Sequence, residues 1–274
     1  MNSLEVMTFD GPLHMVEEIR QVDSVSEVKR DLANKSFHGC PLDLRTVDDL
    51  RGALVKTWRE GIALVERTAA SLRDVEMPAP VARRRSKVWA EDGDEVCEER
   101  LERGQPCWRS TRRKPMPGSK VVTLGVGVAA SAMHSPESLA WRTAAAVVLA
   151  ELLEPAGFAC EIVAYRYSGG MYVDGRDSII VCPVKEASAP IDIGTLVNVL
   201  SPWFYRTAFF AAGWIGGQVT EGYGRVNKVS GSGAEKYVAG GSEAYYLDSV
   251  WSEQTAIEAV KAILAEASRR QDAA

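Results

Sequence analysis

The sequence lacks the long apolar run that a membrane-spanning helix needs. Its longest apolar candidate, Thr143–Leu153, is followed by Glu and Pro and falls well short of the roughly 20 residues that cross a bilayer. The opening residues MNSLEVMTFDGPLH contain neither a basic segment nor an apolar stretch, so we expect no signal peptide. These absences predict a cytoplasmic protein without a membrane partner.

Cysteine is too sparse and too scattered for a disulfide framework or a zinc site. The number of cysteines is odd, and no two of them stand in C-x-x-C spacing, which argues against both kinds of site. We therefore expect reduced thiols at every position. The five cysteines are Cys40, Cys97, Cys107, Cys160 and Cys182.

The common motifs of nucleotide binding and hydrolysis are also missing. The sequence has no G-x-G-x-x-G, no GK[ST] of a P-loop and no G-x-S-x-G, so nothing indicates a phosphate loop or a nucleophile elbow. His134 stands three residues after Ser131, but no third group is apparent that would orient it. We predict a non-enzymatic protein without a cofactor. An enzyme with an unrecognised pocket around His38 or His134 is the alternative.

The chain of 274 residues does contain a clear helical pattern near its start. From Thr46, apolar residues recur at steps of three and four, which predicts one long helix. Thr46 and Asp49 have the spacing of a capping box, and Gly52 and Gly61 weaken the helix slightly. We expect residues 1–80 to form a helical segment whose apolar face docks on the rest of the protein.

Residues 81–119 form a charged segment with few aliphatic side chains. Eleven basic and seven acidic residues lie between Val81 and Lys120, which predicts a surface arm with a short helix at Glu98–Arg103. Clustered cations beside tryptophan can bind nucleic acid, but the acidic middle can neutralise them. We favour an arm that folds over the domain and keep nucleic-acid or protein binding as alternatives. The nucleic-acid candidates are Arg83, Arg84, Arg85, Lys87, Trp89, Trp108, Arg112, Arg113 and Lys114.

Residues 120–274 alternate between strand and helix patterns. Such alternation predicts an α/β domain with a mainly parallel sheet that helices cover on both faces. We expect Ser135 and Pro136 to begin the first of these helices and Pro202 to break a later one. Aromatic residues of 203–214 are expected in the core. The expected strands are 120–128, 158–167, 178–184 and 243–251, the expected helices are 137–155, 192–216 and 252–270, and 222–242 is expected to be a loop.

Through VVTLGVGVAASAM and YYLDSVWSEQTAIEAVKAIL, this region resembles a von Willebrand factor A (VWA) domain. The resemblance implies a Rossmann-like, doubly wound fold whose first strand ends in a D-x-S-x-S loop that helps bind Mg²⁺ or Mn²⁺. Here Gly127 stands at the Asp position and Ala129 at the first Ser position. Neither supplies the side-chain oxygen that a hard cation needs. We therefore expect a degenerate metal site, with Ser131, Asp192 and Thr195 as weak candidate ligands.

The whole chain is also similar to uncharacterised proteins of tailed bacteriophages, through SFHG, WAEDGDE and HSPESLAWRTAAAVVLAELLEPAGF. This similarity implies a phage origin and a place in the cytoplasm of an infected host cell. We predict an adaptor or scaffold that binds a phage or host protein through loops at the carboxyl ends of the strands, the usual ligand position in such sheets. The candidate contacts are Ser131, His134, Asp192, Thr195, Tyr223 and Arg225.

Overall fold

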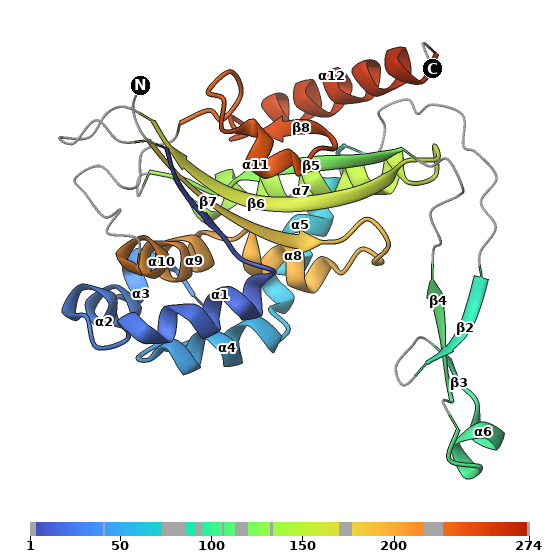
Figure 1. Ribbon diagram of the computed structural model, residues 1–274, viewed down its shortest axis with the longest axis horizontal. Coiled ribbons are helices and arrows are strands. Elements are labelled where there is room, and N and C mark those ends of the chain that lie inside the picture. The colour runs from blue at the N-terminus through green and yellow to red at the C-terminus, as the bar shows by residue number, and fades with distance from the viewer. Residues whose placement is uncertain are drawn as a thin grey trace.

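A computed structural model of the protein describes residues 4–40, 42–72, 86–90, 95–105, 107–112, 120–131, 134–169, 177–215 and 227–272. Its centre is a five-stranded mixed sheet with the order β1-β7-β6-β5-β8 (Figure 1). Strands β6 and β7 are antiparallel, and the other neighbouring pairs are parallel. The mainly parallel α/β sheet expected from the sequence is confirmed. The strands are β1 (Leu4–Thr8), β5 (Val121–Gly127), β6 (Ala159–Ser168), β7 (Asp177–Lys185) and β8 (Glu243–Leu247).

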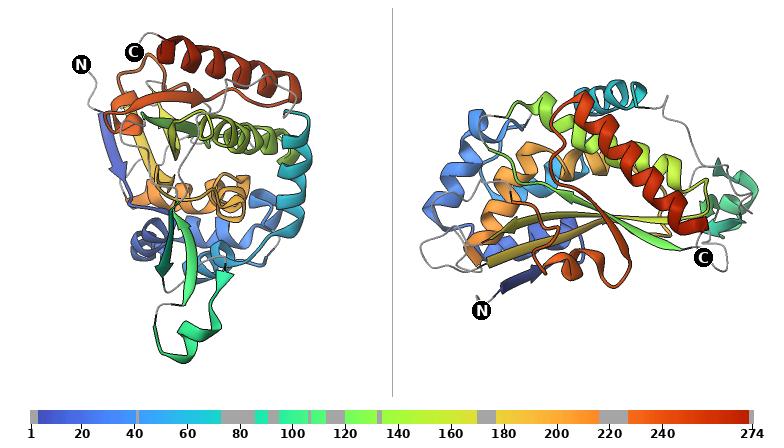
Figure 2. Two further views of the ribbon diagram at one scale, coloured as in Figure 1. Left: turned by 90° about the vertical axis from the view of Figure 1, so that its right-hand side faces the viewer. Right: turned by 90° about the horizontal axis from the view of Figure 1, so that it is seen from above.

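One face of the sheet packs against α7 (Pro136–Leu153), the most deeply buried helix of the protein's main core. Its residues 144–150 are at most 1% exposed, because α7 also contacts α5 (Arg59–Ala70) and α12 (Glu253–Asp272). In Figure 2, α7 lies among the sheet, α5 and α12. A helix enclosed in this way is apolar around its whole circumference, which explains its alanine-rich sequence. Ser135 caps α7 and Pro136 opens it, as expected.

The other face of the sheet has a thinner cover. A second, smaller hydrophobic core lies on this face. It contains Val163, Tyr165 and Val181 of strands β6 and β7, together with Val229 and Val238 from the chain before β8. Val238 belongs to a short helix, α11 (Glu235–Ala239), in the stretch expected to be a loop. The helix begins where the Glu235 carboxylate accepts the backbone N–H groups of residues 231 and 233. Cover on both faces is therefore present but unequal among the described residues.

The N-terminal residues pack into the same main core as the sheet. The expected helical segment begins only at Pro12, because Leu4–Thr8 form strand β1 of the central sheet. The single helix expected from Thr46 is wrong, because the chain forms two helices with a break at residues 56–58. The break is fixed by Asn198, whose side-chain amide donates to the carbonyls of Leu54 (2.9 Å) and Lys56 (3.2 Å). The capping box of Thr46 and Asp49 is present. The elements are α1 (Pro12–Glu18), the 3₁₀ turn η1 (Ile19–Val22), α2 (Ser26–Ala33), α3 (Lys35–His38), α4 (Val47–Val55) and α5.

The segment after β7 is helical and breaks before Pro202, as expected. Ser201 accepts the backbone N–H of Phe204 and caps the helix that Pro202 opens. Trp203, Phe204 and Phe209 are all at most 1% exposed, so these aromatic residues belong to the core. The elements are α8 (Ile193–Val199), α9 (Pro202–Phe204), the π-helical turn η2 (Tyr205–Phe209) and α10 (Phe210–Ile215).

The charged arm contains a small antiparallel sheet that was not expected from the sequence. Its order is β2-β4-β3, with β2 (Ser86–Ala90), β3 (Glu95–Val96) and β4 (Trp108–Arg112). The expected short helix is present as α6 (Glu98–Glu102). In Figures 1 and 2 this sheet projects from the body instead of folding over it. All five cysteines are free thiols, and none of the described helices combines the length and apolarity of a membrane span.

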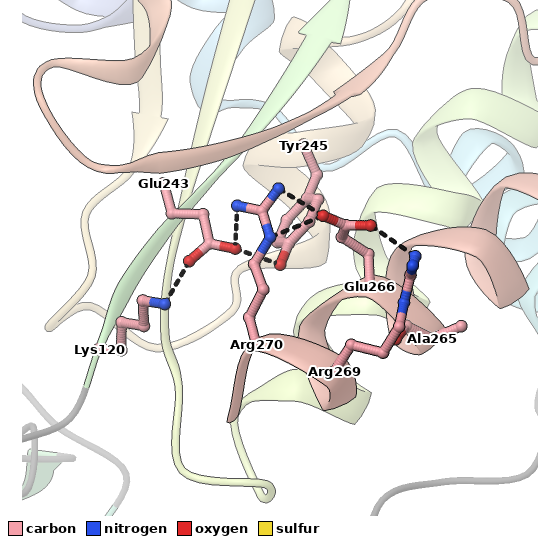
Figure 3. A network of polar contacts seen from close by, with 7 residues as sticks. All are labelled: Lys120, Glu243, Tyr245, Ala265, Glu266, Arg269 and Arg270. Atoms are coloured by element: carbon pink, nitrogen blue, oxygen red, sulfur yellow. Dashed lines mark hydrogen bonds and ion pairs between the residues drawn. The ribbon is translucent and has the colours of Figure 1, made fainter. Parts of the chain in front are cut away.

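Ion pairs join the starts of β5 and β8 to the end of α12 (Figure 3). Glu243 binds Lys120 (2.6 Å), Arg270 (2.6 Å) and the Tyr245 hydroxyl (2.6 Å). Arg270 also binds Glu266. Burial raises the pKa of Glu243, but the hydrogen bonds from Lys120 and Tyr245 and the charge of Arg270 outweigh it, so the pKa lies below its ordinary value.

The first prediction concerns pH. Because its pKa is lowered in the folded protein, Glu243 contributes stability that is present above about pH 4.5 and is lost as the pH falls through the lowered value. The variant Glu243→Gln should be less stable than wild type at pH 7 and should lose less stability on acidification. Urea unfolding at a series of pH values measures both. Parallel pH profiles of the two proteins would contradict the role of this carboxylate.

The second prediction uses two helical glycines. A Cβ at Gly61 would lie 2.4 Å from Trp58 Cε3 and 2.8 Å from Val197 Cγ1, whereas no such neighbour lies within 4 Å of one at Gly52. Gly52→Ala should therefore raise the free energy of unfolding by about 0.5–1 kcal/mol. Gly61→Ala should lower it by about 1–3 kcal/mol, because overpacking outweighs the helix propensity. Urea unfolding of both variants gives the comparison, and a gain at Gly61 would refute the close packing.

Candidate functional site

Strand β5 is the point at which the chain changes the side of the sheet on which it adds strands. The connection through α7 leads to β6 on one side of β5, while β8 lies on the other side. In α/β sheets the carboxyl ends of the strands at such a switch point form the usual ligand position. Here that position holds Gly127, at the end of β5, and Asp248, which follows β8. A Cβ at Gly127 would lie 3.0 Å from Asp248 Oδ1, so the two strand ends are in close contact.

Arg142 of α7 lies directly beneath this edge and is only 3% exposed. Its Nη1 donates to the carbonyls of Gly127 and Ala129, and its guanidinium carbon lies 4.1 Å from the centroid of the Trp251 ring. Within the described residues, Nε and Nη2 have no hydrogen-bond partner. Burial lowers the pKa of Arg142 to about 10, against the opposing influence of Tyr165 and Asp248. Arg142 is therefore a fixed positive charge at neutral pH.

Asp248 is the acidic group of the site, and Tyr165 binds it. The Tyr165 hydroxyl donates a hydrogen bond to Asp248 Oδ1. Burial raises the pKa of Asp248, while the hydrogen bond from Tyr165 and the charge of Arg142 act in the opposite direction. Burial and the neighbouring Asp248 also raise the pKa of Tyr165 well above its ordinary value. Tyr165 thus stays a hydrogen-bond donor, and the edge contains its own cation and its own acid.

This arrangement does not fit the Mg²⁺ or Mn²⁺ that the VWA resemblance implies. Gly127 and Ala129 supply no side-chain oxygen, and their carbonyls are already bound by Arg142. The guanidinium charge would repel a divalent cation at the same place. Across the described part of the chain, no group of three or more His, Cys, Asp or Glu side chains could hold a metal ion.

The structure separates the candidate ligands named from the sequence. Ser131 and His134 lie at the edge described above: the Ser131 carbonyl accepts from Arg206 Nη2 (3.1 Å), and the His134 ring stacks on Trp251 at 4.2 Å. Asp192 instead caps α8 by accepting the Thr195 hydroxyl (2.7 Å) and backbone N–H (3.3 Å). Asp192 and Thr195 line a different cavity, beside α1 and the end of α4. Tyr223 and Arg225 lie outside the described residues.

The nucleic-acid candidates are only partly placed. Trp108 is 37% exposed. Lys87, Trp89 and Arg112 belong to strands β2 and β4. The candidates outside the described residues are Arg83, Arg84, Arg85, Arg113 and Lys114.

His38 has a structural role. Its Nδ1 accepts the backbone N–H of Cys40 (2.9 Å), so Nε2 carries the proton and donates it to the Leu32 carbonyl (3.0 Å). Burial lowers the pKa of His38, which favours this neutral form. Both ring nitrogens are engaged, and His38 is therefore not available as a general base.

A comparison with known protein families identifies the family of this chain. A family model described as "Domain of unknown function (DUF7192)" matches residues 3–269. The chain belongs to the DUF7192 family. The match includes β1, the arm and most of α12, so the DUF7192 domain spans nearly the whole α/β unit together with its N-terminal helices. No curated protein and no solved structure matches this chain.

Sequence reasoning missed the residues at the centre of this DUF7192 site: Arg142, Tyr165, Asp248 and Trp251. Two signals were nevertheless present. Arg142 is a lone charge within the apolar run LAWRTAAAVV, and Asp248 directly follows the strand residues EAYYL. A lone charge in a buried helix calls for partners, but the sequence does not say which strand ends supply them.

The third prediction tests the Arg142 contacts. In Arg142→Met the carbonyls of Gly127 and Ala129 lose their donor, and Asp248 loses its nearby positive charge. The free energy of unfolding should therefore fall by about 3 kcal/mol or more, as measured by urea denaturation. Arg269→Met, on the exposed surface of α12, is the matched control and should change stability by less than about 0.5 kcal/mol. Equal stability of the two variants would contradict the assignment.

Proposed function

We propose that this DUF7192 protein is a non-enzymatic interaction module of phage origin, an adaptor or scaffold that binds a phage or host protein. One observation carries the proposal: at the switch point of the sheet, the buried guanidinium of Arg142 binds the carbonyls of Gly127 and Ala129, at the loop where the VWA resemblance implies a cation. In this proposal the edge offers a contact surface in place of a metal site.

The VWA resemblance supports this proposal through the arrangement of the strands. Strand β5, helix α7 and strand β6 follow one another as the resemblance implies, and the glycine-containing end of β5 meets an aspartate that follows β8. In the proposal, Arg142 contributes the positive charge that the metal supplies elsewhere, and Asp248 retains an acidic role beside it.

The polar groups of this edge favour recognition over catalysis. Arg142 is fully enclosed and cannot contact a substrate. The raised pKa of Tyr165 opposes its ionisation, and the His134 ring is stacked on Trp251. The accessible surface above the edge comes from the first turn of α7 and from the residues before α12, where Glu137 and Ser252 are exposed. The half-buried Trp251 lies beside them, and tryptophan is among the residues enriched in protein interfaces.

The fourth prediction compares the two edges of the sheet. Glu137 is exposed at the proposed edge, and Glu186 is exposed after β7 at the opposite one. With tagged protein in an infected-host lysate, Glu137→Lys should weaken capture of the partner about tenfold or more, because it reverses the charge within the interface. Glu186→Lys should leave capture unchanged.

The same experiment, repeated with excess chelator, tests the role of Arg142. Capture should persist, because the proposed contact needs no metal bridge. Loss of capture in chelator would overturn the replacement of the metal by Arg142. Equal capture by both charge-reversal variants would overturn the location of the interface.

A second candidate function is nucleic-acid binding through the arm. The observation that favours it is the small sheet that projects from the body. Trp108 is exposed in this sheet, and Trp89 of β2 is opposite Arg109 of β4 in the strand register. This candidate requires that nuclease treatment of the lysate abolish capture and that binding weaken steeply with salt. Capture that survives nuclease favours the protein-binding edge.

A further inference from the structure

A cavity of about 250 Å³ lies beside the break between α4 and α5. It is distinct from the sheet edge described above. Its rim is formed by the exposed residues of the break and the first turn of α5, and its floor by buried residues of α4, α8 and α9. The lining residues include Leu42, Ala53, Lys56, Trp58, Arg59 and Trp203.

The walls of this cavity are apolar and aromatic. Trp58 and Trp203 contribute indole rings, and Leu42 and Ala53 add aliphatic surface. Trp203 is 1% exposed, and its Nε1 has no hydrogen-bond partner among the described residues. Walls of this kind suit a flat apolar body, because aromatic rings offer large rigid contact surfaces.

The cavity is held open by a tertiary contact. Asn198 is buried and donates to the carbonyls of Leu54 and Lys56, so the end of α4 cannot extend as a helix into the space. Gly61 has no side chain, which lets Trp58 and Val197 of α8 both lie close to α5. The shape is therefore preformed, which reduces the ordering cost of binding.

The rim has an excess of positive charge. Lys56 and Arg59 are both exposed, and neither forms an ion pair within the described part of the chain. Glu60 is the one acid among the residues that line the cavity. Other surface cations do have acidic partners, as Lys35 has with Asp43 (3.0 Å). Two exposed cations above an apolar floor match a ligand with one anionic group.

We infer that this cavity binds a small organic anion with a flat apolar body, such as an aromatic carboxylate. The ring lies against Trp58, above Trp203 in the floor, and the carboxylate faces Lys56 and Arg59 at the rim. This binding site is independent of the protein-binding edge, since it uses none of the same residues.

The fifth prediction uses naphthalene-2-carboxylate and its neutral carboxamide as probes. Each is titrated into the full chain while the indole N–H signals are followed by NMR, with the Trp58 signal assigned through Trp58→Phe. The carboxylate should shift the Trp58 and Trp203 signals and bind about fivefold more tightly than the carboxamide. A difference of this size corresponds to two partly screened charge contacts. Added salt should reduce the difference.

The double variant Lys56→Gln/Arg59→Gln should bind the two probes equally. The matched control Arg51→Gln/Lys261→Gln removes two other exposed cations and should keep the preference for the carboxylate. Both substitute exposed side chains, and far-UV circular dichroism verifies that the variants are folded. Shifts confined to other tryptophans, no shift with either probe, or equal affinity of wild type for both probes would overturn the inference.

Discussion

The structure depends on the deep burial of α7. This helix contacts the sheet, α5 and α12, and its residues 144–150 are almost inaccessible to solvent. Because a helix buried on every side gains little from polar side chains, any charge within it must have partners. Arg142 is that charge. Its position, two residues before Ala144, directs the guanidinium to the carboxyl end of β5.

The properties of the sheet edge follow from that placement. Arg142 binds the Gly127 and Ala129 carbonyls, which orders the turn after β5. Its charge lies near Asp248, which Tyr165 also binds. The guanidinium lies over the Trp251 ring, and His134 stacks on the same ring. One buried side chain thus connects the ends of β5 and β8 with the residues that begin α7 and α12.

Local patterns in the sequence predicted local structure well. The capping box at Thr46 and the Ser135 cap depend on residues three positions apart, and both formed. The break after Val55 and the strand β1 were missed because they depend on distant partners. Asn198 creates the break, and β1 pairs with Asp177–Val181. No pattern within a short window contains such information.

The candidate site was only half predictable for the same reason. The turn after β5, with Ser131 and His134, could be located from the strand and helix patterns around it. Asp192 was chosen as a partner from the sequence, but the neighbour of β5 is β8, and Asp248 is therefore the acid at this edge. The order of the strands in the sheet, which tertiary packing decides, places Asp248 and not Asp192 beside the end of β5.

The most direct test of the central claim is thermal unfolding of wild type at increasing Mn²⁺ concentration and in excess chelator. A ligand that binds the folded state raises the melting temperature by mass action. If Arg142 has replaced the metal, Mn²⁺ and chelator should leave the melting temperature unchanged. A rise that depends on Mn²⁺ concentration and disappears in Asp248→Asn would contradict the account, because it would place a cation at the edge that Arg142 is proposed to fill.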